Sequence, residues 1–375
     1  MRPVTRRLAL LAAALLLSAP PALAGAPHVD GRAYLVENGV TGEVLARSRD
    51  RERLPIASIT KLMTVLVALR HVHLDDVVTV SRQAAAVGES SIYLRKGEQL
   101  TVRDLVEAAL IQSANDAAVA LAEYVGGSQA AFVEMMNAEA KRLKLRDTHF
   151  ANPDGLDAAG HYSSAHDVTR LARIAMKNAF VRQVVARSTA TIAGGRTLTT
   201  WNDLLGRFPG VFGVKTGHTS AAGWSEVAAA RDHGVTVYAT LLGAPSREGR
   251  NADLEELLAW GISRYRTVGV VSPTRVYATA AAPYGRARLS LVAGRGITRL
   301  VRVDRPLVER VVAPTAVSLP VRKGQRLGEV RVYAGRKLIA RRPLVAARSI
   351  GRPGLIGRTE WYAGRTLDHI AGWFS

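Results

Sequence analysis

Cysteine is absent from the 375-residue chain, so disulfides, thiolate metal sites and a cysteine nucleophile are excluded. Aromatic residues are scarce, at 6%, and no helix-turn-helix, zinc or aromatic RNA-binding signature accompanies the many basic residues, which argues against nucleic acid as a partner. Beyond the N-terminus, no apolar run approaches the roughly 18 residues of a membrane-spanning helix. The length predicts two domains, because single domains cluster near about 100 to 200 residues.

Residues 1–24 have the composition of a cleavable secretion signal peptide. Arginines near the start precede the apolar run Leu8–Leu17, and Ala22-Leu23-Ala24 supplies a small-x-small cleavage site before Gly25. The alternative is an uncleaved N-terminal anchor, which the shortness of the apolar run disfavours. We therefore expect export across the cytoplasmic membrane, to the periplasm or cell envelope.

Acidic residues are few relative to basic ones, and the formal net charge is +20. From Val271 onward there are 20 Arg or Lys against five Asp or Glu, so this stretch carries about +15 of the total. Such a bias favours an anionic partner. For a secreted chain, anionic lipid headgroups or an acidic cell-wall polymer fit best; the alternative is the codon bias of a high-GC genome.

Residues 28–268 mix helical and strand periods, which predicts an α+β domain with helices packed on an antiparallel sheet. Hairpins are expected around the turns at 38–42 and 232–234. A capping-box variant, Thr101 to Asp104, opens another helix. The expected helices span residues 58–69, 101–111, 115–124, 166–176 and 180–185, and a strand is expected at 211–216.

Residues 271–348 alternate inward and outward side chains between Gly-rich turns, which predicts a small all-β domain. Residues 353–375 then form an amphipathic segment, with apolar residues at helical spacing and tryptophan and tyrosine nearby. Aromatic rings of this kind sit at lipid headgroup level, so the segment is interpreted as lying on a membrane surface. The alternative is a helix folded back onto its own domain.

Ser58-Ile59-Thr60-Lys61 places a hydroxyl and an amine one helical turn apart on the same face. A neutral lysine can take the serine proton if burial or neighbouring cations lower its pKa. The start of a helix also favours developing negative charge. By itself the four-residue pattern is weak, because serine and lysine are common.

Two further short motifs supply complementary groups. Ser113-Ala114-Asn115 adds a hydroxyl and an amide at a junction between two expected helices, where the alternative is a simple helix cap. Lys215-Thr216-Gly217, followed by His218, ends a strand, and the glycine would let a substrate backbone lie alongside it. The order and spacing of the three motifs indicate acyl transfer, with a nucleophile and base, a proton relay and a cationic anchor for a carboxylate.

With these motifs the chain resembles the penicillin-interacting serine D,D-peptidases, and most closely the low-molecular-mass D-alanyl-D-alanine carboxypeptidases of the penicillin-binding protein 5/6 type. The resemblance covers residues 28–350 and is tighter in the first domain than in the second. Beyond the three motifs it rests on Glu89–Tyr93, Asn115–Ala118, Thr148–Phe150, Asn152–Leu156, Tyr162–Ser164 and Leu257–Gly261.

The resemblance implies a β-lactamase/transpeptidase-like catalytic fold and a role for each motif residue. Ser58 would attack the penultimate D-alanine carbonyl with Lys61 as general base, and Ser113 with Lys215 would pass a proton to the departing D-alanine. The substrate-binding residues it implies are Asn115, Thr216, Gly217, His218 and Arg250.

Within that set, Asn115 would orient the substrate amide, and Thr216 with Arg250 would hold the terminal carboxylate. Backbone N–H groups of Ser58 and His218 would form the oxyanion hole. An exposed loop position is the alternative for Arg250, since Arg247 lies close in the sequence.

The implied reaction removes the terminal D-alanine from peptidoglycan stem pentapeptides without metal or cofactor, and penicillins would acylate the same serine. A class A β-lactamase is disfavoured because no glutamate occurs between Lys141 and Lys215. A D,D-endopeptidase that cuts crosslinks is the alternative within hydrolases. A catalytically silent wall-binding protein is the alternative of another class, and the intact motifs argue against it.

Overall fold

The computed structural model describes residues 14–16, 25–284, 287–356, 359, 361–363 and 366. They fall into two compact units, a first unit, Gly25–Ser263, and a second unit that runs from Arg264 and includes the N-terminal strand at 14–16. Each unit has its own hydrophobic core.

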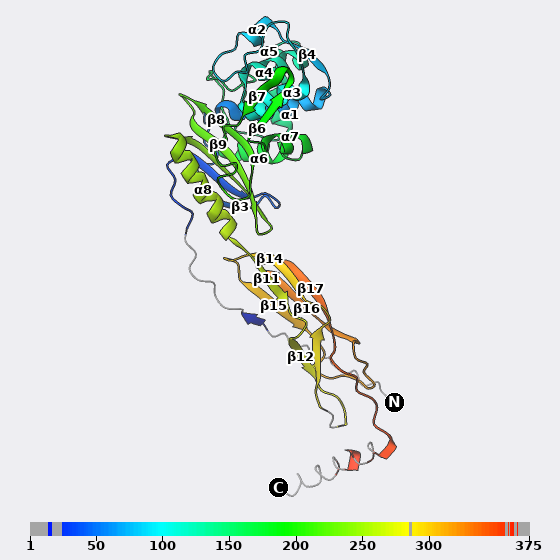
Figure 1. Ribbon diagram of the computed structural model, residues 1–375. Coiled ribbons are helices and arrows are strands. Elements are labelled where there is room, and N and C mark those ends of the chain that lie inside the picture. The colour runs from blue at the N-terminus through cyan, green and yellow to red at the C-terminus, as the bar shows by residue number, and fades with distance from the viewer. Residues whose placement is uncertain are drawn as a thin grey trace. The chain divides into compact units, whose positions relative to one another are not determined.

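The first unit is built on a five-stranded antiparallel sheet in the order β3-β2-β10-β9-β8 (Figure 1). Its strands are β2 (Ala33–Asn38), β3 (Val44–Ser48), β8 (Val211–Thr219), β9 (Gly223–Asp232) and β10 (Val235–Ala244). Both hairpins expected from the turns at 38–42 and 232–234 are confirmed. The small and β-branched residues of β9 and β10 are buried on both faces, because helices cover the sheet from both sides.

Figure 1 shows α8 (Arg247–Ser263) along one side of the sheet and α6 (Ala165–Ala175) on the other. On the α8 side, Gly261 lies against Val237 and Val36. On the α6 side, the hydroxyls of Thr169 and Thr240 form a buried hydrogen bond of 2.6 Å. Val237 and Thr240, an odd number of positions apart on β10, thus face different helices, as the alternation of a strand requires.

The other helices and two small hairpins of the first unit lie on the α6 side of the sheet (Figure 1). The helices are η1 (Ala57–Thr60), α1 (Lys61–His71), α2 (Arg82–Ala85), α3 (Val102–Glu107), the π-helix η2 (Ala108–Gln112), α4 (Asn115–Gly126), α5 (Gln129–Arg142), α7 (Ala179–Val185) and η3 (Ala193–Gly195). The hairpins pair β4 (Val77–Thr79) with β5 (Gln99–Thr101) and β6 (Thr189–Ile192) with β7 (Arg196–Thr199). The expected helices are confirmed, including the reciprocal Thr101–Asp104 capping box.

The second unit confirms the expected all-β architecture. Its six-stranded sheet has the order β1-β15-β16-β17-β13-β12, and β11 pairs with β14 in a separate ladder. The strands are β1 (Ala14–Leu16), β11 (Tyr265–Val271), β12 (Val276–Ala280), β13 (Leu289–Ala293), β14 (Ile297–Arg302), β15 (Leu307–Val312), β16 (Arg326–Ala334) and β17 (Lys337–Ala346).

Both terminal segments lie mostly outside the described residues. Of the expected signal peptide, 1–24, only residues 14–16 are described, and they pair with β15. Of the expected amphipathic segment, 353–375, the described rings of Trp361 and Tyr362 pack edge-on against Tyr284. Within the described part of the chain, no helix is both long and apolar enough to cross a membrane.

Candidate active site

Ser58 lies on the short helix η1, which leads directly into α1, so Lys61 is the first residue of α1. Ala57, just before the serine, has a φ of 48°, a conformation that is uncommon and costly for a non-glycine residue. The chain therefore turns sharply into the helix at the position where the hydroxyl is presented.

Two glycines pack against this turn. A Cβ atom on Gly155, whose φ is +89°, would lie 2.0 Å from the carbonyl oxygen of Ala57. A Cβ atom on Gly217 would lie 2.6 Å from the carbonyl oxygen of Ile56. Close packing of β8 on η1 is thus one reason for the glycine of the Lys-Thr-Gly motif, and the room for a substrate backbone that the sequence suggested stays a prediction.

Lys61 is buried, and its Nζ atom donates to three oxygens. These are Ser58 Oγ at 2.7 Å, Asn115 Oδ1 at 2.7 Å and the carbonyl oxygen of Asp154 at 2.6 Å. Burial lowers the pKa of Lys61 to about 7, although the nearby carboxylates of Asp154, Asp116 and Glu89 oppose the shift. The amine can therefore be neutral near neutral pH and accept the serine proton.

Ser113 and Lys215 form the second polar pair. Ser113 directly follows the π-helix η2 and takes the left-handed conformation with a φ of 64°. That turn brings its hydroxyl to 2.8 Å from Lys215 Nζ on β8, and the same nitrogen donates to the carbonyl oxygen of Thr216. Burial, followed by the charge of Lys61, lowers the pKa of Lys215 well below its usual value.

Asn115 begins α4 and is held from three sides. Its Oδ1 accepts from Lys61, its Nδ2 donates to the carbonyl oxygen of Gly88 at 3.1 Å, and its backbone N–H donates to the carbonyl oxygen of Ser90. The amide orientation is fixed by these partners, since only Oδ1 can accept from the lysine. The side chain therefore links the lysine to the segment at 88–90.

These groups open into a cavity of about 220 Å³. Its lining residues are Ser58, Glu89, Ser90, Ser113, Trp201, Thr216, Gly217, His218, Trp224 and Arg250. The structure thus brings all nine sequence-predicted site residues to one place, six in the lining and Lys61, Asn115 and Lys215 directly behind it.

Arg250 is 1% exposed and lies in the first turns of α8, not in an exposed loop. Its guanidinium donates to Asp203 and Asn251 and lies 3.2 Å from the carboxylate of Glu226. Burial raises the pKa of Glu226 to about 7, against the influence of Arg250. A substrate carboxylate entering the cavity would meet a guanidinium whose position is already fixed.

Several residues of the site were not singled out from the sequence. Glu226, Asp203 and Asn251 fix Arg250, Trp224 stacks on His218 at 4.0 Å between ring centroids, and Trp201 lines the cavity. The glutamate occupies an ordinary-looking position on β9, where burial on both faces could not be inferred. For the tryptophans, large aromatic residues in predicted loops were the available signal.

The arrangement has the parts of a serine acyl-transfer enzyme: a hydroxyl, a buried amine of lowered pKa, a second hydroxyl–lysine pair and a fixed cation in one cavity. Comparison with known proteins identifies the family. The family model described as D-alanyl-D-alanine carboxypeptidase matches residues 21–246. The chain belongs to this serine peptidase family.

Individual relatives support the same family assignment. The chain is 33% identical to the D-alanyl-D-alanine carboxypeptidase DacD of Salmonella typhimurium, over 95% of this chain and 98% of that protein. The crystal structure of penicillin binding protein 6B from Escherichia coli is 31% identical, with a TM-score of 0.65 over 88% of this chain and 100% of that one. Ampicillin-bound penicillin-binding protein D2 from Listeria monocytogenes is 31% identical, with a TM-score of 0.58 over 63% of this chain and 98% of that one. The expected fold and the expected serine-type D-alanyl-D-alanine carboxypeptidase function are thereby confirmed.

Proposed function

We propose that this chain removes the terminal D-alanine of peptidoglycan stem pentapeptides through an acyl-enzyme on Ser58. The contact between Lys61 Nζ and Ser58 Oγ, at 2.7 Å in a buried setting, carries the proposal. Lys61 takes the hydroxyl proton as the oxygen attacks the penultimate D-alanine carbonyl, and the peptide bond to the terminal D-alanine breaks.

The second pair serves the leaving group. Ser113, in contact with Lys215, relays a proton to the departing D-alanine nitrogen, and water then hydrolyses the ester on Ser58. Asn115 orients the substrate amide, while Thr216 and Arg250 hold its carboxylate. Backbone N–H groups of Ser58 and His218 bind the oxyanion.

β-Lactams enter as substrate mimics that acylate Ser58 and clear slowly, in keeping with the ampicillin-bound relative. We further propose that residues 1–24 direct export, and that the enzyme acts on the outer face of the cytoplasmic membrane through its basic second unit and the segment 353–375. The charge bias from Val271 onward and the apolar spacing of that segment support this location.

Parallel digestion of two kinds of muropeptide tests the reaction: monomers with free pentapeptides, and crosslinked dimers. The wild-type protein should release D-alanine from the pentapeptides and leave the dimers intact. Ser58→Ala should lose at least about 10³-fold of this activity, while Ser188→Ala, an exposed serine in the same unit, should keep it. Retained release by Ser58→Ala would contradict the assigned nucleophile, and consumption of the dimers would favour an endopeptidase.

A further inference from the structure

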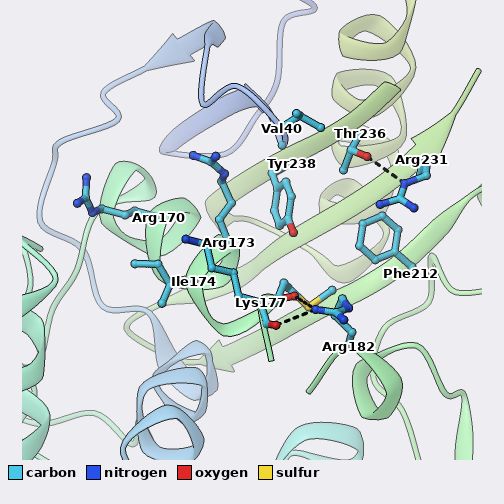
Figure 2. A pocket seen from close by; sticks show the side chains of 12 residues that line it. Val40, Arg170, Arg173, Ile174, Lys177, Arg182, Phe212, Arg231, Thr236 and Tyr238 are labelled. Carbon is cyan, nitrogen blue, oxygen red and sulfur yellow. Dashed lines mark hydrogen bonds between the residues drawn. The ribbon is translucent and has the colours of Figure 1, made fainter. Parts of the chain in front are cut away.

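A second, larger cavity lies in the first unit, away from the Ser58 cavity and at the opposite end of β8. Its volume is about 890 Å³. It is walled by the turn after β2, the end of α6, the middle of α7, and the sheet ends at β8, β9 and β10 (Figure 2). The lining residues are Gly39, Val40, Arg170, Arg173, Ile174, Met176, Lys177, Arg182, Phe212, Arg231, Thr236 and Tyr238.

Five of the twelve lining residues are arginine or lysine, and none of the twelve is acidic. Among the described residues, only Arg173 of these five has a carboxylate partner, Glu37 on β2. Elsewhere in the same unit, arginines at 70, 142, 187, 196 and 247 pair with acids. Unpaired cations gathered in one concave site repel one another and focus a positive potential, which an anion would relieve.

Three of the unpaired cations are nevertheless held in place. Arg170 donates through Nε to the carbonyl oxygen of Leu143, Arg231 donates through Nε to Thr236, and Arg182 donates through one Nη to the carbonyl oxygens at the end of α6. Each bond leaves other guanidinium nitrogens of the same residue available. The Nε of Arg173 is buried and has no hydrogen-bond partner within the described structure.

Figure 2 shows Arg173 and Lys177 on one side of the cavity, Arg231 and Phe212 on the other, and Arg182 below Tyr238. A guanidinium can donate two parallel hydrogen bonds to the oxygens of a phosphate group. The cavity far exceeds one phosphate and falls in the size range of sites for extended small molecules. The carbonyls at the end of α6, which would repel an anion, are covered by Arg182.

We propose that this cavity binds a ligand carrying two or more phosphate groups. The ligand chemistry could come from a soluble phosphate-containing polymer or from a lipid headgroup with two phosphates. The site is separate from the carboxypeptidase reaction, because none of its residues lines the Ser58 cavity or contacts Ser58, Lys61 or Lys215 in the described structure.

Calorimetric titration of the full chain with tripolyphosphate tests the proposal. A salt concentration of about 0.15 M screens non-specific attraction. Saturable binding at one site is expected. Lys177→Gln/Arg231→Gln should weaken it at least about tenfold, the loss that corresponds to about 1.4 kcal/mol. Lys141→Gln/Arg82→Gln removes the same net charge from exposed positions and should change the affinity less than twofold.

Two measurements keep the result unambiguous. Protein first acylated with a β-lactam should bind tripolyphosphate as before, since the Ser58 cavity is then blocked. Lys177→Glu alters a side chain that has no hydrogen-bond or ion-pair partner among the described residues. It should abolish binding while its acylation rate stays that of the wild type. Absence of saturable binding, equal losses in the two double variants, or competition by the β-lactam would each overturn the proposal.

A further titration distinguishes a lipid headgroup from a soluble phosphate-containing ligand. It is carried out in the presence of neutral-lipid vesicles doped with cardiolipin, whose headgroup carries two phosphates. A lowered apparent affinity for tripolyphosphate in their presence assigns the site to a lipid headgroup. An unchanged affinity assigns it to a soluble phosphate-bearing ligand.

Discussion

At the scale of single residues, Lys61 is the group on which acylation depends. Its buried Nζ contacts Ser58, Asn115 and the carbonyl oxygen of Asp154, and it cannot accept a proton while it is charged. Lys215 is a second buried amine of lowered pKa, and the charge of Lys61 contributes to that lowering. The two amines therefore titrate as a coupled pair, and a rate profile reports the pair.

The pH dependence of acylation follows from this pair. Since burial lowers the pKa of Lys61 to about 7, the amine is protonated below that pH and becomes a base above it. The second-order rate constant for acylation by a fluorescent penicillin should fall about tenfold per pH unit below about pH 6.5 and level off above about pH 7.5. A rate constant that stays flat from about pH 5 to pH 8 would contradict the assignment of the base.

The variant Gly155→Ala tests how tightly the turn before Ser58 is packed. An added Cβ would combine a φ of +89° with a 2.0 Å approach to Ala57, so Gly155→Ala should lower the melting temperature and slow acylation at least about tenfold. Gly234→Ala is the control, because Gly234 has a φ of +79° with nothing within 4 Å of the added atom. It should cost about 1 kcal/mol and leave acylation unchanged. Equal effects of the two variants on the acylation rate would show that packing on the turn does not matter.

At the scale of secondary-structure elements, the start of α4 holds the neighbouring segment that borders the Ser58 cavity. The carboxylate of Asp116 accepts from the hydroxyl of Ser91 at 2.6 Å and from the backbone N–H groups of Ile92 and Leu94. Glu89 and Ser90, which line the cavity, belong to the same segment. Asp116 is therefore a positioning residue that acts through a loop.

Removal of this carboxylate leaves buried backbone donors without partners. Asp116→Ala should lower the free energy of unfolding by about 3 kcal/mol, measured by denaturant titration. It should also raise KM more than it lowers kcat, since the segment borders the substrate cavity without touching the reacting atoms. Asp75→Ala is the control, because it removes a side chain that is 88% exposed. It should leave the free energy of unfolding, KM and kcat unchanged within measurement. Wild-type stability of Asp116→Ala would refute this role.

The sequence was sufficient for the elements that periodicity and turn chemistry determine, such as the hairpins of β2 with β3 and β9 with β10. It also indicated the three motifs, because their order and spacing carry the chemistry. It did not reveal the π-helix η2, since a single turn with i→i+5 hydrogen bonds is too short to leave a period of its own in the sequence. The left-handed Ser113, which aims the hydroxyl at Lys215, follows from that turn.

Long-range packing could not be predicted from the sequence either. Gly217 packs against the backbone of Ile56, and the carboxylate partners of Arg250 come from β9 and from the residues before β8. Such contacts join segments far apart in the chain, and no local pattern encodes them. The cation-lined cavity is a further case, because its five arginine and lysine residues come from separate elements that the fold brings together.

At the scale of the whole molecule, the charge bias and the C-terminal segment determine where we expect the enzyme to act. Deletion from Pro353 to the end should reduce sedimentation with phosphatidylglycerol vesicles, because it removes the apolar residues at helical spacing and the aromatic residues near them. Added salt should weaken the binding that remains, which rests on the basic residues of the second unit. The truncated protein should keep its penicillin acylation rate as a control for folding. Unchanged sedimentation after the deletion would refute the surface anchor.

The position of the penicillin adduct tests the central assignment most directly. Trypsin cuts after Arg53 and after Lys61, so Ser58 lies in the short peptide Leu54–Lys61. Mass mapping of benzylpenicillin-treated protein should find the penicilloyl group on Ser58 in this peptide and no adduct in Ser58→Ala. An adduct on another residue, or one that persists in Ser58→Ala, would contradict the proposed site.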